Sequence, residues 1–333
     1  MCLVFKNKMS NRYIKMEEVF REFKPNAKES TIKAYVASLS KLKRMLGDND
    51  YEPDLVFPLL EKLHYTSRRN ILNSIIVYLQ AIGKPTDDIV PFLKKRDEYN
   101  KRYADEQLSG KITEKQQPNF ISLDDLKEML KRMEPEIKQI KKDAKTKSIT
   151  ASQKNVLSAY TLFVSYMSMP LRNDLASMKI ITKRGFNKIP SEEKSKNNYL
   201  LIGKNQLSFV LNNYKTAGKY GEKILPLPKS VERKMRSYMK LMDLPRTNDI
   251  LFDFNSNSMT QLLIRTSEKY IKKRIGTTML RKIYLSDKFS DTKKEKEKDA
   301  NVMGHSKEMG ELVYTKDKAD MVKIDEVAPP PNV

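Results

Sequence analysis

The chain has 333 residues, with 64 Lys and Arg against 42 Asp and Glu, so its formal net charge is +22. Nucleic acid is the default partner for such a charge, although a lysine-rich surface from biased codon usage is the simpler alternative. One cysteine excludes an internal disulfide and a cysteine-based zinc site, two histidines argue against a histidine metal cluster, and no apolar run or signal peptide points to a membrane, so we expect an intracellular, soluble protein.

The first part of the chain has the pattern of a helical domain. Residues 1–28 are basic and weakly patterned, and we expect an arm that leads into the domain. Helical periodicity begins at Ser30, and Gly47 supplies a C-terminal stop. The apolar positions that share one stripe of this helix are Ile32, Tyr35, Val36, Leu39, Leu42 and Leu46.

Two further helices complete this domain, for which we expect the bounds 1–108. One runs from about Thr66 to Ile82, and the other follows Pro91 and ends near Glu106. A small bundle with basic faces is the expected product. Its candidate DNA contacts are Lys41, Lys43, Arg44, Arg68 and Arg69. The last two lie in a helical first turn, where cations oppose the helix dipole, so they either contact phosphate or are merely solvated.

Residues 109–120 lose apolar periodicity, and we interpret them as an interdomain linker. Ser122 and Asp125 then form a capping-box-like start of a second domain, 121–316. Its first helix buries a stripe that begins at Leu126, and another apolar helix covers about 151–168. The final segment, 317–333, contains a proline run that cannot continue a helix, and we expect a C-terminal tail.

In the middle of the second domain the helical periodicity gives way to a β-strand pattern. Short β-prone runs cover 178–182, 199–202, 207–212 and 224–227. Helical patterns return at about 230–242, 258–273 and 277–287, followed by the mixed-charge segment 291–299, which is a helix or a loop. The sequence therefore predicts a mainly α protein with a small antiparallel β-sheet: an N-terminal helical DNA-binding bundle and an α+β second domain.

Basic landmarks recur in a fixed order before one tyrosine. Arg172 stands in MPLRNDL, Lys215 in NNYKTAG at a predicted hairpin tip, and Arg281 in TTMLRKIY. Gly304-His305 then lies nine residues ahead of Tyr314. A phenol with a pKa near ~10 is a poor nucleophile at neutral pH unless cations surround it. Two guanidiniums can bind the non-bridging oxygens of a phosphodiester, and a lysine can protonate the departing oxygen.

These residues resemble the pattern of the tyrosine recombinase (phage-type integrase) family, and the resemblance covers most of the chain. It implies an enzyme that cleaves and rejoins duplex DNA through a 3′-phosphotyrosyl intermediate on Tyr314, without a metal or other cofactor. Arg172 and Arg281 would stabilise the pentacoordinate phosphate, His305 would add a donor, and Lys215 would be the general acid. The resemblance also implies a homotetramer on two DNA sites.

Two positions depart from the family pattern. Thr278 stands where the family's H-x-x-R motif has histidine, so a hydroxyl would bind the phosphate oxygen instead. The acidic residue that usually lies three positions after the first arginine is here Asp174, two positions after Arg172. We expect Asp174 to orient the arginines.

Plainer roles remain open for the same residues. Tyr314 could be a core aromatic, Arg172 a salt-bridge partner of Asp174, and Thr278 a helix N-cap. Lys219 competes with Lys215 as the lysine of the turn.

Other functions also remain open. A type IB topoisomerase shares the chemistry, whereas a catalytically inactive DNA-binding protein would share only the charge. An RNA-binding protein is a third reading. Lysine-rich, glycine-poor usage suits an AT-rich viral or mobile genome, which would place the protein in a host cytoplasm or nucleus.

Overall fold

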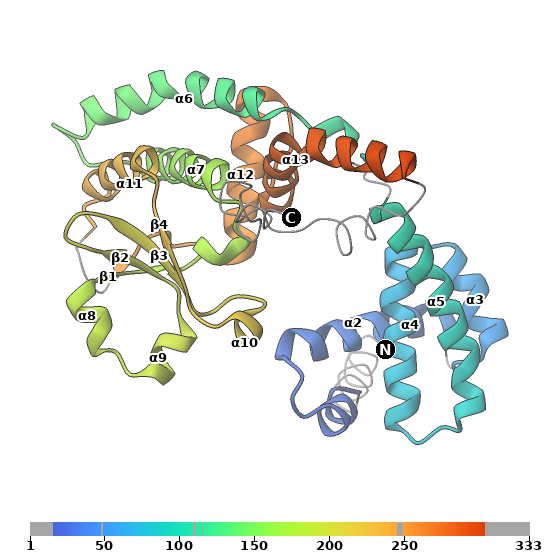
Figure 1. Cartoon of the computed structure of the whole chain (residues 1–333). Helices are drawn as coiled ribbons and strands as arrows, with labels where there is room; N and C mark the ends of the chain where they lie inside the picture. Colours follow the sequence, from blue (N-terminus) through green and yellow to red (C-terminus); the bar gives the residue numbers. More distant parts are fainter. Residues whose placement is uncertain (1–15, 48, 109–110, 115, 245–248, 304–333) are drawn as a thin grey trace, which may run out of the picture. The chain divides into compact units, whose positions relative to one another are not determined.

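The computed structural model describes residues 16–47, 49–108, 111–114, 116–244 and 249–303. The chain divides into two compact units, Met1–Ile112 and Thr113–Val333. This division falls within the segment 109–120 for which the sequence predicts a linker. Helices dominate both units, and the sheet belongs to the second (Figure 1). No helix in the described ranges is both long and apolar enough to cross a membrane.

The first unit is a bundle of helices around one apolar core. Its helices are α2 (Glu29–Leu46), α3 (Pro53–Glu61), α4 (Tyr65–Ala81) and α5 (Thr86–Leu108). The predicted stripe of α2 is confirmed, since Ile32, Val36, Leu39, Leu42 and Leu46 are buried and Tyr35 packs against them half-buried. Gly47 ends the helix at φ +68°, a conformation that glycine adopts without steric cost.

Three features of the first unit differ from the sequence-based expectation. Residues 16–23 are helical and place Phe20 in the core, so this part of the predicted arm belongs to the bundle. Helix α3 was not predicted. Helix α5 begins at Thr86 rather than after Pro91, because Asp87 and Asp88 provide a favourable acidic first turn.

The second unit packs several helices around a small sheet. Its longer helices are α6 (Leu123–Asp143), α7 (Ala151–Ser168), α11 (Lys229–Leu241), α12 (Ser256–Ile271) and α13 (Thr277–Val302). Shorter ones are η1 (Gln117–Asn119), η2 (Asn173–Leu175), α8 (Lys183–Lys188), α9 (Ser191–Lys196) and α10 (Ala217–Tyr220). The capping box at Ser122 and Asp125 is confirmed, and α7 has the predicted bounds.

The sheet of the second unit is mixed rather than antiparallel. Its strands are β1 (Lys179–Thr182), β2 (Tyr199–Ile202), β3 (Leu207–Leu211), β4 (Lys223–Pro226) and β5 (Asp249–Ile250), in the order β4-β3-β2-β1-β5. The expectation of antiparallel pairing is wrong for β1 and β2, which are parallel. The reason is the crossover through α8 and α9, which returns the chain to the end of the sheet at which β1 begins, so that β2 runs in the same direction.

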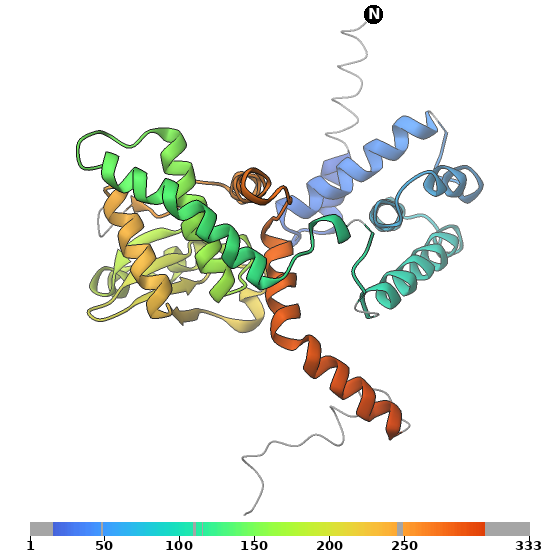
Figure 2. The ribbon, with the colours of Figure 1, turned by 90° about the horizontal axis from the view of Figure 1, so that it is seen from above.

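Both faces of this sheet are covered. On one face Ile180, Leu200 and Phe209 join the main core with side chains of α7 and α11, and α6 lies over that helical layer (Figures 1 and 2). On the other face Tyr199 and Val210 pack with Phe186 of α8. Alternate residues of each strand therefore serve opposite layers, which fixes the register of the strands.

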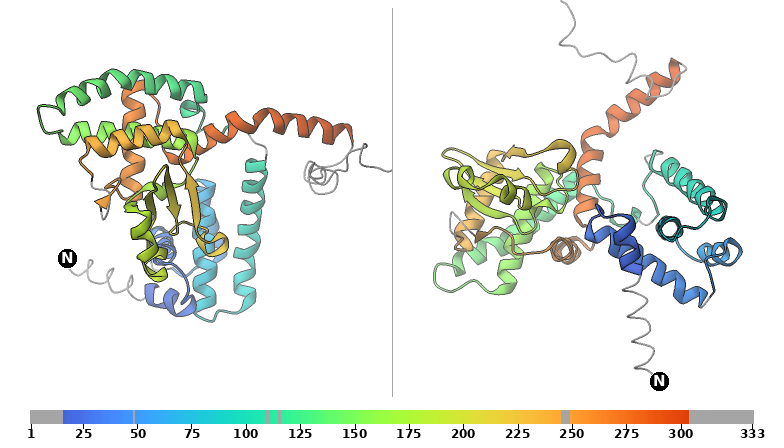
Figure 3. Two further views of the ribbon diagram at one scale, coloured as in Figure 1. Left: turned by 60° about the vertical axis from the view of Figure 1, so that its left-hand side comes forward. Right: turned by 90° about the horizontal axis from the view of Figure 1, so that it is seen from below.

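Helix α13 is longer than the sequence pattern indicates. It starts at Thr277 as expected but continues through the mixed-charge segment 291–299 to Val302. Its first turns are anchored by buried Leu280 and Ile283, whereas described side chains from Leu285 onward are almost all exposed. The later turns extend beyond the other helices of the second unit (Figure 3).

Candidate active site

The loop after α7 holds Arg172 and is fixed from three sides. Helix α7 ends at Ser168, and buried Tyr166 on that helix donates a hydrogen bond from its hydroxyl to the Arg172 carbonyl oxygen at 2.6 Å. Asn173 donates to Ser256 O and to Thr260 Oγ1 of α12, each at 3.1 Å. The third tie is a hydrogen bond at 2.9 Å to the Asp174 carbonyl oxygen from Nδ2 of Asn198, the residue just before β2. The backbone that carries Arg172 and Asp174 is thus held by α7, α12 and the sheet.

The Arg172 guanidinium itself is exposed and has no ion pair among the described residues. The carboxylate of Asp174 instead accepts the backbone N–H of Arg172 at 3.1 Å. A simple salt bridge between these two side chains, one of the plainer readings of the sequence, is therefore absent in the described part of the chain.

The first turns of α13 carry a second arginine, Arg281, whose charge acts on Asp174 and on Tyr166. Asp174 is half-buried, and burial raises the pKa of its carboxyl, while the Arg172 N–H and the charges of Arg172, Arg281 and Lys223 lower it. Burial also raises the pKa of Tyr166, with Asp174 raising it further and Arg281 lowering it. The charges of cations from three separate segments thus act on one partly buried carboxylate. Arg281, like Arg172, has no ion pair among the residues described.

Thr278 is exposed at the start of α13 and lines a pocket of about 240 Å³. Since the helix begins at Thr277, Thr278 is its second residue and not its N-cap. The pocket is also lined by Thr260, Met279 and Lys282. The first N–H groups of a helix lack intrahelical acceptors, so this end of α13 favours an anion.

Lys215 lies in the connection of the β3–β4 hairpin, as the sequence predicts. The connection contains the short helix α10 and is closed at its base by Tyr214, which donates to Gly221 O at 2.8 Å. Lys215 is exposed and makes no polar contact among the described residues. Its competitor Lys219 lies over the ring of Tyr220, 5.3 Å from its centroid.

Sequence reasoning missed Lys223, the first residue of β4. Its charge acts on Asp174, and its ammonium lies 5.0 Å from the ring centroids of both Tyr214 and Tyr220. The only local signal was its place directly before the β-prone run 224–227. The convergence on Asp174 depends on tertiary structure.

The last two candidates, His305 and Tyr314, lie outside the described residues. In the described residues the charges of Arg172, Arg281 and Lys223 thus act on Asp174, and the nucleophile stays a prediction from sequence. Within the described ranges, no three His, Cys, Asp or Glu residues are grouped so that they could hold a metal ion.

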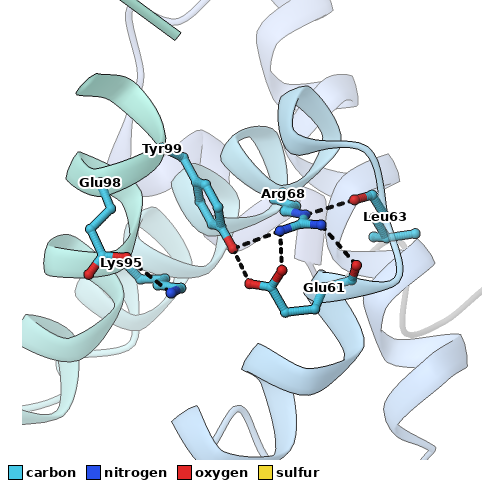
Figure 4. A network of polar contacts seen from close by, with 6 residues as sticks. All are labelled: Glu61, Leu63, Arg68, Lys95, Glu98 and Tyr99. Carbon is cyan, nitrogen blue, oxygen red and sulfur yellow. Dashed lines mark hydrogen bonds and ion pairs between the residues drawn. The ribbon is translucent and has the colours of Figure 1, made fainter. Parts of the chain in front are cut away.

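Two arginines of the first unit are engaged within the bundle. Arg68 binds Glu61, Leu63 and Tyr99 through all three of its side-chain nitrogens, and it joins the α3–α4 corner to α5 (Figure 4). Arg69 donates to Asn100 and lies 4.1 Å from the ring centroid of Tyr103. Arg68 is therefore neither merely solvated nor free for phosphate.

The three predicted contacts on α2 are more open. Lys41 is exposed and makes no polar contact within the described part of the chain. Lys43 donates to Asn49 O and lies 5.4 Å from the Tyr51 ring centroid, and exposed Arg44 donates to Ser40 O at 3.3 Å. Each of these bonds uses only part of the donor capacity of its side chain.

Comparison with known proteins adds little to this geometry. No known family description and no curated protein matches the sequence. Among solved structures, the chain is similar to the XerA recombinase, with 12% identity over 93% of this chain and 95% of that one, and a TM-score of 0.30. A likeness at this level establishes neither family nor function, so the function rests on the residues of the chain itself.

Proposed function

We propose that the chain is a DNA-cleaving and DNA-rejoining enzyme of the tyrosine recombinase type. The observation that carries the proposal is that the charges of two guanidiniums, Arg172 and Arg281, both act on the half-buried Asp174, with no ion pair to hold either one in the described residues. Arginine pairs of this kind suit the two non-bridging oxygens of a phosphodiester. The order Arg172, Lys215, Arg281, His305, Tyr314 in the sequence supports the same reading.

In the proposed reaction, the Tyr314 oxygen forms a bond to phosphorus while the bond from phosphorus to O5′ breaks. The phenol loses its proton to water or His305, and Lys215 gives a proton to the departing O5′. Arg172, Arg281 and the Thr278 hydroxyl would stabilise the charge that develops on the phosphoryl oxygens. Because the phosphotyrosyl bond conserves the phosphodiester energy, a 5′-hydroxyl of another strand can reverse the step.

Asp174 and Lys223 have supporting roles in this proposal. Ionised Asp174 would hold the Arg172 loop and Arg281 in register before DNA binds. Lys223 keeps the local charge positive, since three cations act on one carboxylate. This excess of positive charge would stabilise the two negative charges of the phosphoryl group in the transition state, which a neutral salt bridge would not do.

The first unit would bind duplex DNA through the basic residues of α2, Lys41, Lys43 and Arg44, with Arg69 as a further candidate. Arg68 is left out of this set because its donors are used within the bundle. Phosphate contacts of this kind make affinity depend steeply on salt. We propose two functional domains, 1–108 and 121–316, and a homotetramer on two DNA sites, as the resemblance implies.

The test is covalent capture. A library of nicked duplexes with randomised centres, in which cleavage releases a short strand and prevents rejoining, is incubated with the protein and separated in denaturing detergent. We expect a protein–DNA adduct for the wild type and for Tyr35→Phe, a control in the first unit, but none for Tyr314→Phe. Adduct formation by Tyr314→Phe, or none by any form, refutes the proposal.

The sequences recovered from the adduct then separate the remaining functions. A selected motif joined efficiently between two duplexes identifies a recombinase, whereas relaxation of supercoiled DNA without exchange identifies a type IB topoisomerase. Binding without an adduct identifies an inactive DNA-binding protein, a reading that the replacement of histidine by Thr278 favours.

A further inference from the structure

One buried side chain joins two segments that hold proposed catalytic groups. Asn198 immediately precedes β2 and is 8% exposed. Its Nδ2 donates to Asp174 O at 2.9 Å and to Asn213 O at 3.0 Å. Its Oδ1 accepts the N–H groups of Asn212 at 3.0 Å and Asn213 at 2.8 Å. All four hydrogen-bonding positions of the amide are used.

Only a side-chain amide of this length satisfies the site. Its partners are two carbonyl oxygens and two N–H groups, so the group between them must donate twice and accept twice. A carboxylate would meet the carbonyl oxygens without a donor, and alanine would leave four part-buried backbone groups without this partner. The partners also fix the orientation of the amide, because the reverse orientation would place its NH2 group against two N–H groups and its oxygen against two carbonyl oxygens.

Asn198 joins two segments that hold groups of the proposed reaction: the loop of Arg172 and Asp174, and the residues just before Lys215. Asp174 belongs to the Arg172 loop, which Tyr166 and α12 hold from other sides. Asn213 lies two residues before Lys215, and the intervening Tyr214 is buried. Asn213 is further fixed by a bond to Lys196 O at 2.9 Å.

We infer that Asn198 is a positioning residue, which sets the location of Lys215 relative to the Arg172–Asp174 loop. This inference rests on the proposed function of the site. Asn198 does not touch the scissile phosphate. It fixes the backbone of the Arg172–Asp174 loop and the backbone just before Lys215, the proposed proton donor to the leaving oxygen. A displacement of about 1 Å in such a group can cost ~100-fold in rate.

The test uses the leaving group. With a phosphodiester whose O5′ is replaced by sulfur, the departing group has a thiol-like pKa near ~8.5 and needs no general acid. We expect Asn198→Ala to slow adduct formation about 10- to 100-fold on the oxygen substrate. On the sulfur substrate it should reach a rate within a few-fold of the wild type, as should Lys215→Ala. Arg172→Ala should stay slow on both substrates.

Two control variants distinguish a loss of positioning from a general folding defect. Tyr238→Phe removes a buried hydrogen bond to Leu251 O elsewhere in the second unit and should leave the rates on both substrates unchanged. Asn198→Asp keeps an acceptor for Asn212 and Asn213 while losing both donors, so it tests the site if the alanine variant fails to fold. It should show the same sulfur rescue and faster amide hydrogen exchange across residues 212–216.

Equal slowing of Asn198→Asp on both substrates, or a change in DNA affinity alone, overturns the positioning role while the wild-type adduct still supports the proposed function. Absence of a wild-type adduct on either substrate removes both.

Discussion

Arg68 offers a sharp test of whether a cation of the first unit serves the fold or the DNA. Its Nε donates to Leu63 O at 2.7 Å and one terminal nitrogen donates to Glu61 O at 2.8 Å. The other terminal nitrogen binds the Glu61 carboxylate and lies 3.2 Å from the Tyr99 hydroxyl (Figure 4). The Arg68 side chain is 16% exposed. We predict that Arg68→Ala destabilises the bundle and leaves the salt dependence of DNA binding unchanged.

The magnitude follows from what the substitution leaves behind. Each bond from a charged donor to a backbone carbonyl is worth about 1.5–3 kcal/mol, and the carbonyl oxygens of Glu61 and Leu63 would both lose one. The Glu61 carboxylate is 52% exposed, so water replaces most of its pairing, and that part contributes about 0–1 kcal/mol. Relaxation offsets some of the sum, and we expect a loss of about 3 kcal/mol, a large share of the stability of a small domain.

The assay follows urea unfolding of the full chain by circular dichroism, with hydrogen exchange of α4 amides to assign the change to the first unit. The matched control is Lys41→Ala, which removes an exposed cation with no polar partner in the described residues. It should leave unfolding unchanged but reduce the slope of log affinity against log salt by about 0.9 if Lys41 contacts one phosphate. An Arg68→Ala protein with wild-type stability and a reduced salt slope would show that the network does not hold the corner.

Two further predictions concern the second unit. Tyr166→Phe leaves the Arg172 carbonyl oxygen without its buried donor, so we expect a loss of about 1 kcal/mol in unfolding free energy and a clearly slower covalent adduct, measured by urea titration and by the capture assay. Asp174→Asn should be more stable than the wild type at pH 7, because the raised pKa of Asp174 means that its ionised form costs folding free energy. Protonation removes that cost, so the advantage should shrink as the pH falls toward about 4. Unfolding curves at several pH values check it, and an advantage that grows in acid contradicts the raised pKa.

Local patterns predicted the helices whose ends are marked by a capping or terminating residue. Gly47 stops α2, and Ser122 with Asp125 starts α6, because a left-handed glycine and a capping box act within a few residues. The parallel pairing of β1 and β2 was not predictable in this way. It depends on where the crossover through α8 and α9 returns the chain, which no local pattern specifies.

The candidate site was predictable to a similar extent. Motif order singled out Arg172, Asp174 and Arg281, and in the structure the charges of both arginines act on Asp174. It missed Lys223 and Asn198, because a lysine at the start of a strand and an asparagine before one have no distinctive spacing. It also assigned Arg68 to the surface. One of its partners, Glu61, lies on the unpredicted helix α3, and the other, Tyr99, lies on α5.

The length of α13 imposes a tether on the proposed nucleophile. From Arg281 to Val302 the helix can extend about 32 Å at 1.5 Å per residue. Tyr314 follows 12 residues later, and such a stretch covers about 40 Å when fully drawn out but only ~18 Å when coiled as a helix. Cleavage by the molecule's own tyrosine at a phosphate held by Arg281 would therefore require a reach of about 32 Å from the end of α13, and each helical turn removed from α13 would shorten that reach by about 5 Å.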